Sequence, residues 1–270
     1  MALVCYNGNF YPDDQPLLTA GNRSFKWGDG IFETMKIWKN RILLESLHFE
    51  RLFLSLKLLG MKQGNLSAVH LSHSILKLCE FNGCNDLARV RLALFRSNHN
   101  DVEYLIEAIP LSHDSMSWNE QGLNIGLYPF ARKSVDAFAN IKSASFLPYV
   151  LASLYAKENG LDDALVMNSH NLIADSSKAN IFWIREDVIH TPPLIQGCIN
   201  GVMRRFLMDA AKRNGQMVKQ EELSEAELLH ADEVFLTNAI QGIRWVRTFK
   251  GNQYGSEKTI EFYKQHLSTI

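Results

Sequence analysis

Hydrophobic and polar residues alternate with two different periods along the first 110 residues, which predicts a mixture of strands and helices. Apolar residues at helical spacing predict one helix that Ser46 caps and Gly60 ends. The other elements expected here are a short strand over 1–11 with a turn at Asn7-Gly8, a hairpin over 31–44 that turns at Lys39-Asn40, a helix over 68–79 closed by Asn82-Gly83, and paired strands at 87–95 and 101–109. In the strand at 87–95, Arg89 and Arg91 share one face.

A polar, turn-rich stretch over 110–122 separates this part from the rest, and we interpret it as a linker. Beyond it, a helix is expected over 146–158 because Pro148 falls in its first turn, where the missing N–H costs little. The remaining predicted elements are strands at 123–128, 164–167, 172–174, 180–184, 188–191, 233–237 and 243–246, and helices over 202–213 and from 257 onward. The pattern predicts an α+β chain in two lobes, and a crevice between lobes is a usual ligand site.

Length and composition support a two-domain globular protein. The chain has 270 residues, of which 46% are hydrophobic and 21% charged. We expect a smaller α/β domain over 1–115 and a larger domain over 116–270. A net charge of -1 leaves no large positive field, so we expect neither nucleic acid nor an anionic membrane as a partner.

The cysteines and the apolar runs favour a cytoplasmic protein. Four scattered cysteines, without a C-x-x-C pair, indicate neither a disulfide framework nor a zinc site, and no metal is expected. No apolar run approaches the roughly 18 residues of a membrane helix. The first ten residues lack the continuous apolar core of a signal peptide.

Spacing alone indicates little chemistry, because no dinucleotide fingerprint, P-loop or metalloprotease motif is present. Lys142 is unusual because it lies between an apolar stretch and a predicted helix. A partly desolvated lysine can attack a carbonyl, whereas a lysine at a domain junction is usually solvated.

Several segments in order give the chain a specific resemblance. They are Arg23-Ser24-Phe25-Lys26-Trp27-Gly28-Asp29-Gly30-Ile31-Phe32-Glu33-Thr34, His48-Phe49-Glu50-Arg51-Leu52, Ile141-Lys142-Ser143, Asp163-Ala164-Leu165, Ala179-Asn180-Ile181-Phe182, Thr191-Pro192-Pro193, Gly201-Val202-Met203-Arg204 and Ala231-Asp232-Glu233-Val234-Phe235. With these, the chain resembles the aminotransferase class IV proteins, which are fold type IV enzymes that depend on pyridoxal 5'-phosphate. The resemblance implies a two-domain fold of that type, with the lysine on the larger domain and the cofactor at the domain interface.

The resemblance also implies roles for individual residues. Lys142 falls on the family's Schiff-base lysine, which also moves the α-proton of the substrate. Arg51 falls on the phosphate-binding arginine, and the helix start at Gly201-Val202-Met203 would bind the remaining phosphate oxygens. Asp175 takes the position of the glutamate that keeps the pyridine nitrogen protonated, although aspartate is one methylene shorter.

Further residues are carried over with less specific motifs. Thr34 could assist proton transfer, and a structural threonine of the strand is the alternative interpretation. Phe32 lies on the same segment, on the side that the family uses for substrate contact. Arg96 and His99 offer an Arg-His pair for a substrate carboxylate, at a spacing that differs from the family's; a polar hairpin tip is the alternative interpretation. Ala239 follows Asn238 in a turn that resembles the lyases and is expected to contact the cofactor.

The resemblance leaves the reaction open between two classes. The leading hypothesis is 4-amino-4-deoxychorismate lyase, which releases pyruvate and 4-aminobenzoate. The second is an amino-acid transaminase of the D-amino-acid or branched-chain type. Leu147 stands where branched-chain enzymes carry a tyrosine, and the segment after Lys142 lacks the Asn-Arg of many lyases. A third hypothesis is a protein of this fold without catalysis. The family's homodimers imply that this chain also dimerises.

Overall fold

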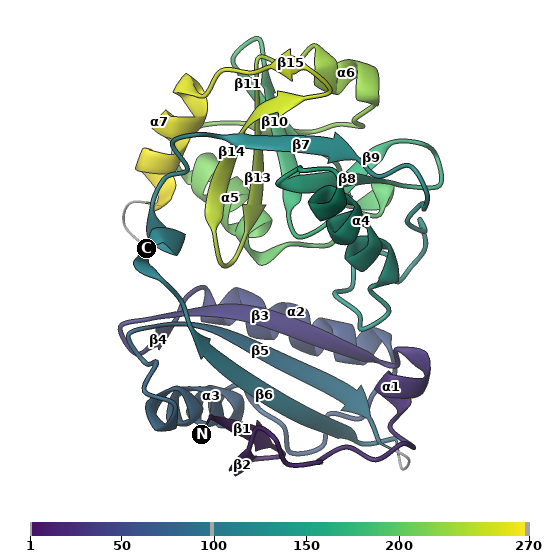
Figure 1. Ribbon diagram of the computed structural model, residues 1–270, viewed down its shortest axis with the longest axis vertical. Helices are drawn as coiled ribbons and strands as arrows, with labels where there is room; N and C mark the ends of the chain where they lie inside the picture. The colour runs from purple at the N-terminus through teal and green to yellow at the C-terminus, as the bar shows by residue number, and fades with distance from the viewer. Residues whose placement is uncertain (1, 98–99, 268–270) are drawn as a thin grey trace. The chain divides into compact units, whose positions relative to one another are not determined.

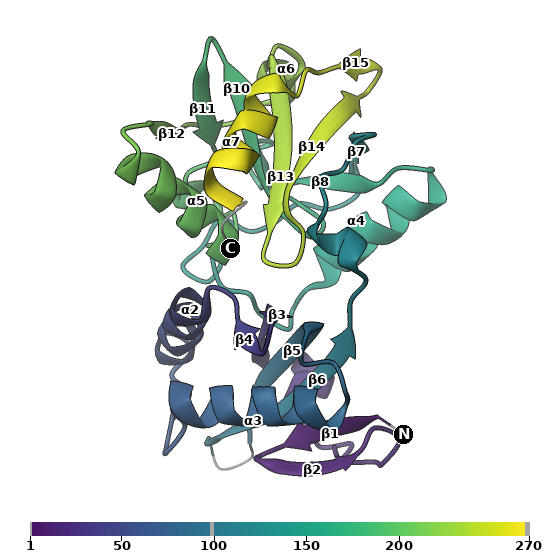
Figure 2. The ribbon, with the colours of Figure 1, turned by 90° about the vertical axis from the view of Figure 1, so that its left-hand side faces the viewer.

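The computed structural model describes residues 2–97 and 100–267, which form two compact units (Figures 1 and 2). The first unit contains residues 1–115 and 141–146, and the second contains 116–140 and 147–270. The segment 141–146, with Lys142, therefore belongs to the first unit and not to the larger one as expected. The reason is hydrogen bonding, because Phe32 N donates to Lys142 O and Ala144 N donates to Gly30 O.

The first unit is a six-stranded sheet with two long helices on one face (Figure 2). Its strand order is β2-β1-β6-β5-β3-β4, and all its neighbouring strands are antiparallel. The elements are β1 (Leu3–Tyr6), β2 (Asn9–Pro12), α1 (Arg23–Trp27), β3 (Gly30–Trp38), β4 (Arg41–Ile42), α2 (Glu45–Leu58), α3 (Ala68–Phe81), β5 (Leu87–Arg96), β6 (Val102–Pro110) and the 3-10 turn η1 (His113–Met116).

Alternation along β3 divides its side chains between the two faces of this sheet. Ile31, Met35 and Ile37 join the apolar side chains of α2 and α3 in one core. Phe32 and Thr34 therefore lie on the opposite face. Since Thr34 pairs with Arg91 of β5 across the ladder, the sheet presents these three side chains together on the face that the helices do not cover.

The second unit is a nine-stranded sheet that curls, because β9 also contacts β10 (Figure 1). Helix α4 packs on β8, whereas α5 and α7 pack on β13. The elements are β7 (Leu123–Leu127), α4 (Leu147–Glu158), β8 (Asp163–Met167), β9 (Ile173–Ser176), β10 (Asn180–Arg185), β11 (Val188–Thr191), η2 (Leu194–Gln196), α5 (Val202–Arg213), β12 (Val218–Gln220), α6 (Glu225–Leu229), β13 (Glu233–Asn238), β14 (Gly242–Phe249), β15 (Asn252–Gln253) and α7 (Glu257–Leu267).

Most predicted elements are confirmed, including both bounds of α5 and the start of α7. The predicted cap of α2 is wrong: the helix begins at Glu45, and Leu44 precedes it in the left-handed region with a φ of 54°. The chain leaves the short strand β4 and turns into the helix at Leu44, so Ser46 lies inside the first turn. Among the described helices, none combines the length and hydropathy that crossing a bilayer requires.

Candidate functional site

Lys142 is held by backbone pairing with the start of β3. Besides the two hydrogen bonds given above, Ile31 and Ser143 form an isolated antiparallel bridge. The side chain of Ile141 packs in the core that the sheet shares with α2 and α3, and this packing fixes residues 141–146 to the first unit. The position of the lysine backbone is thus set by a strand that is distant in sequence.

The amine of Lys142 lies against two aromatic rings. Its Nζ is 4.4 Å from the ring centroid of Phe32 and 5.0 Å from that of Phe146. The two rings contact each other edge to face at 5.2 Å. Aromatic faces attract a cation and also shield it from water, so the amine has a partly apolar surrounding.

Arg91 completes this group and was not named as a site residue from the sequence. Its Cζ lies 4.0 Å from the centroid of the Phe32 ring, which Lys142 also contacts. The sequence feature that could have indicated Arg91 is the face that it shares with Arg89 on the predicted strand. The structure thus brings together Lys142, Phe32 and Arg91, with Thr34 as the ladder partner of Arg91.

Arg51 belongs to a buried ionic group on the helix-covered face of the same sheet. Its Nε donates to Glu33 Oε1 at 2.8 Å, and its Nη2 donates to Oε2 at 2.5 Å. His48, one turn earlier on α2, hydrogen-bonds Glu33 Oε2 through Nδ1 at 2.7 Å. Burial raises the pKa of Glu33, but the Arg51 charge and the His48 bond more than offset it and lower the pKa to about 2. Glu33 is therefore ionised and orients the Arg51 guanidinium.

Arg96 is engaged inside the first unit. Its Nε donates to Asp29 Oδ2 at 3.0 Å, and its Nη2 donates to the carbonyl of Leu59 at 2.8 Å. The first contact anchors the end of β5 to the turn before β3, and the second joins it to the end of α2. They support a structural role for Arg96, and its substrate role stays a prediction. The predicted partner His99 lies outside the described residues.

Asp175 is the centre of a buried polar group in the second unit. Its Oδ2 accepts from the Tyr149 hydroxyl at 2.8 Å and from Ile199 N at 2.9 Å, and the Lys133 amine lies 3.4 Å away. Its Oδ1 accepts from Asn180 Nδ2 at 2.8 Å. Burial raises the pKa of Asp175, against the Lys133 charge and these hydrogen bonds. Sequence reasoning identified the acid but not Lys133 or Tyr149, because neither lies near it in the sequence.

The start of α5 adjoins this acid through Asn180. Gly201 is the N-cap of the helix, and none of the described side chains caps it. A Cβ on Gly201 would overlap Asn180 Oδ1. The Nδ2 of Asn180 binds both Asp175 and the carbonyl of Ile199. A glycine is therefore required at this position because Asn180 lies so close to its Cα. Backbone strain is not the cause, since the φ of Gly201 is -64°.

The turn between β13 and β14 carries Ala239. Asn238 Oδ1 accepts from Ile240 N at 3.0 Å and from Gln241 N at 2.8 Å, which shapes the turn. Ala239 itself is half-buried. Its contact with a cofactor stays a prediction.

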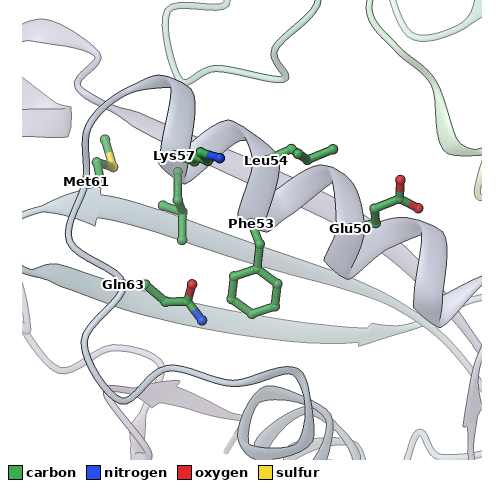
Figure 3. Close-up of a pocket in the computed structure, with 7 residues that line it drawn as sticks. Glu50, Phe53, Leu54, Lys57, Met61 and Gln63 are labelled. Carbon is green, nitrogen blue, oxygen red and sulfur yellow. The ribbon is translucent and has the colours of Figure 1, made fainter.

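A pocket of about 540 Å³ lies elsewhere, beside α2 and the loop that follows it (Figure 3). It is lined by Glu50, Phe53, Leu54, Leu56, Lys57, Met61 and Gln63. Its lining contains none of the predicted site residues, and we assign it no role in the chemistry.

Comparison with known proteins gives one family and several named relatives. The family model described as amino-transferase class IV matches residues 30–249. A putative branched-chain-amino-acid aminotransferase of Methanocaldococcus jannaschii is 25% identical over 97% of this chain and 93% of its own length. An aminodeoxychorismate lyase of Bacillus subtilis is 26% identical over 94% of this chain and 89% of its own length.

A solved structure shows the same fold. The branched-chain aminotransferase of Thermoproteus uzoniensis with norvaline superposes with a TM-score of 0.88 at 22% identity, covering 98% of this chain and 93% of that chain. The predicted α+β, fold type IV architecture is thereby confirmed.

Proposed function

Because the chain belongs to the amino-transferase class IV family of enzymes, we propose that it removes the α-proton of an amino-acid-type substrate with pyridoxal 5'-phosphate and Lys142. The observation that supports this most directly is the Lys142 amine, which is fixed by β3 and lies against Phe32 and Phe146. When bound, the cofactor supplies an electron sink that stabilises charge at the α-carbon. In this proposal Lys142 holds the cofactor covalently and later accepts the α-proton at Nζ, and Thr34 assists that proton transfer.

The second unit contains groups that suit the phosphate and the ring nitrogen of this cofactor. The first turn of α5 has no side-chain cap, and its N–H groups at Val202 and Met203 suit a phosphate. Asn180 packs directly against Gly201 and hydrogen-bonds Asp175, so the start of α5 lies close to this carboxylate. Asp175 is the carboxylate that would bind a protonated ring nitrogen. The donor set therefore fits pyridoxal phosphate.

Arg51 is the residue of the first unit that we assign to the phosphate. A guanidinium can bind phosphate through two parallel N–H groups, and a fixed plane favours that geometry. Glu33 fixes that plane through Nε and Nη2.

For the finer activity we propose 4-amino-4-deoxychorismate lyase, with a transaminase as the second candidate. The lyase is supported by the B. subtilis relative and by the Asn238-Ala239 turn that resembles the lyases. The transaminase is supported by the M. jannaschii relative and by the segment after Lys142, which departs from the lyase pattern. Both reactions use the same residues up to removal of the α-proton.

A two-arm assay separates the candidates. Purified protein loaded with pyridoxal phosphate is incubated with aminodeoxychorismate in one arm, and with an amino donor and 2-oxoglutarate in the other. We expect 4-aminobenzoate and pyruvate in the first arm. Glutamate in the second arm without 4-aminobenzoate in the first would refute the lyase. Borohydride reduction that leaves no label on Lys142 would refute the cofactor chemistry itself and favour a non-catalytic protein.

We further propose that the chain forms a homodimer in the cytoplasm. Helix α4 buries Tyr149, Ala152 and Ala156 but exposes an apolar stripe at the spacing i, i+3, i+4, i+7. The stripe consists of Leu147, Val150, Leu151 and Leu154, which are 37–64% exposed. Because an exposed apolar stripe is costly in water, we assign it to contact with a second copy. The four cysteines, all free, suit a reducing compartment.

A further inference from the structure

Lys133 is the buried cation behind Asp175, and its own backbone is fixed. Its N–H donates to the carbonyl of Met167 at 2.9 Å, and its carbonyl accepts from Ser169 N at 3.0 Å. Its side chain is only 9% exposed and that of Asp175 is 3% exposed. The aromatic face of Tyr149 lies 5.2 Å from its Nζ. The amine is thus confined to the neighbourhood of the carboxylate.

The donors around Asp175 are unequally divided between its two oxygens. Oδ2 faces three donors, from Tyr149, Ile199 and Lys133, whereas Oδ1 receives one, from Asn180. A carboxylate oxygen accepts about two hydrogen bonds well. Oδ2 is therefore saturated, and Oδ1 is the oxygen with capacity for another donor.

The buried carboxylate of Asp175 needs a cation beside it, and Lys133 is that cation. Burial raises the pKa of Asp175 and lowers the pKa of Lys133, because each charge alone is poorly solvated. The other titratable groups facing Asp175 are the Tyr149 phenol, the Cys198 thiol and the Arg204 guanidinium. Lys133 and Arg204 are the two cations among these groups, and Lys133 is the one with a direct contact to the Asp175 carboxylate.

We infer that Lys133 is a positioning residue that keeps the shortened acid Asp175 ionised, with Oδ1 directed at the ring nitrogen of the cofactor. The inference rests on the proposed function for the ring nitrogen, but the pairing of Lys133 with Asp175 stands without it. The cation of Lys133, the Tyr149 hydroxyl and Ile199 N together fix the orientation of the short Asp175 side chain. A ring nitrogen bound at Oδ1 would then hold its proton less tightly than beside a carboxylate that has no cation behind it.

The test compares Lys133→Met with Lys133→Arg, and uses Lys157→Met as the control for removing a lysine from an exposed position of the same unit. Carboxyl-13C NMR of the cofactor-free protein follows the titration of Asp175, assigned with Asp175→Asn. We expect K133M to raise the midpoint by one pH unit or more, because a charge at 3.4 Å is removed from a buried site. K133R and K157M should leave the midpoint within a few tenths of a unit of the wild type.

A second measurement uses the loaded protein. The 15N shift of the ring nitrogen of bound pyridoxal phosphate reports its protonation against pH. In K133M we expect the ring to keep its proton to a higher pH, and K133R to restore the wild-type profile. An Asp175 midpoint and ring profile in K133M equal to those of K157M would overturn the inference. If K133M does not fold, Lys133→Gln takes its place with the same criteria. Failure of the wild type to bind the cofactor would refute the proposed function, while the Asp175 titration would still decide the pairing.

Discussion

Replacing Gly201 with alanine tests the packing at the start of α5. The new Cβ would occupy the place of Asn180 Oδ1, so the Asn180 side chain must move. Its movement breaks the bonds from Nδ2 to Asp175 and to the carbonyl of Ile199, both 2.8 Å long. The first bond has a charged acceptor and contributes about 1.5–3 kcal/mol, and the second contributes about 1 kcal/mol.

The expected cost is therefore about 2.5–4 kcal/mol of unfolding free energy. Strain does not add to it, since the backbone at Gly201 is in a region open to alanine. The change of the N-cap residue itself contributes less than about 1 kcal/mol. Urea unfolding of the cofactor-free protein measures the difference. Gly255→Ala is the matched control, because its nearest neighbour would be Glu233 Cγ at an ordinary 3.6 Å.

A double-mutant cycle isolates the cause. In an Asn180→Ala background the obstructing side chain is absent, so Gly201→Ala should cost no more than about 1 kcal/mol. We also expect G201A to weaken binding of pyridoxal phosphate at least tenfold, measured by fluorescence titration. If G201A costs the same free energy with and without Asn180, the steric reasoning is wrong.

Three further predictions concern other parts of the chain. Glu33 has a lowered pKa, so its stabilisation of about 3 kcal/mol is present above pH 4.5 and lost as the pH falls towards 2; in Glu33→Gln, acid unfolding curves should lack this loss. Lys142→Met should abolish borohydride labelling and lower turnover at least a thousandfold while leaving the unfolding midpoint near that of the wild type, and undiminished turnover would refute the assignment. Leu154→Arg should shift the protein from dimer to monomer in sedimentation velocity, whereas Lys157→Met on the same helix should not; an unchanged dimer would remove α4 from the interface.

Periodic segments of the sequence predicted their elements well. Helix α4 was predicted because Pro148 marks its start and Asn159-Gly160 its end, and α5 because Gly201 marks the start of an amphipathic segment. The short helix α6 was missed, although Ser224 and Glu227 form a capping box that could have indicated it. Five residues are too few for a periodic signal.

The candidate site residues were predicted from local motifs, and their roles stay predictions. Lys142, Arg51 and Asp175 stand in recognisable segments, but their partners come from distant parts of the chain. Lys133 is 42 residues from Asp175 and lies in an irregular segment without any pattern. Likewise, the grouping of Lys142 with the first unit depends on pairing with β3, which periodicity does not report.

The chain passes between its two units three times, because residues 141–146 are inserted from the second unit's sequence into the first. Truncation after Ser115 would consequently strip the sheet of the backbone that pairs with Gly30 and Phe32, and would open a hole where Ile141 packs. Residues 1–115 look like an independent domain in the sequence, but they are not expected to fold stably without residues 141–146. A stable fragment needs the six-residue segment grafted back, and that segment carries the Lys142 amine.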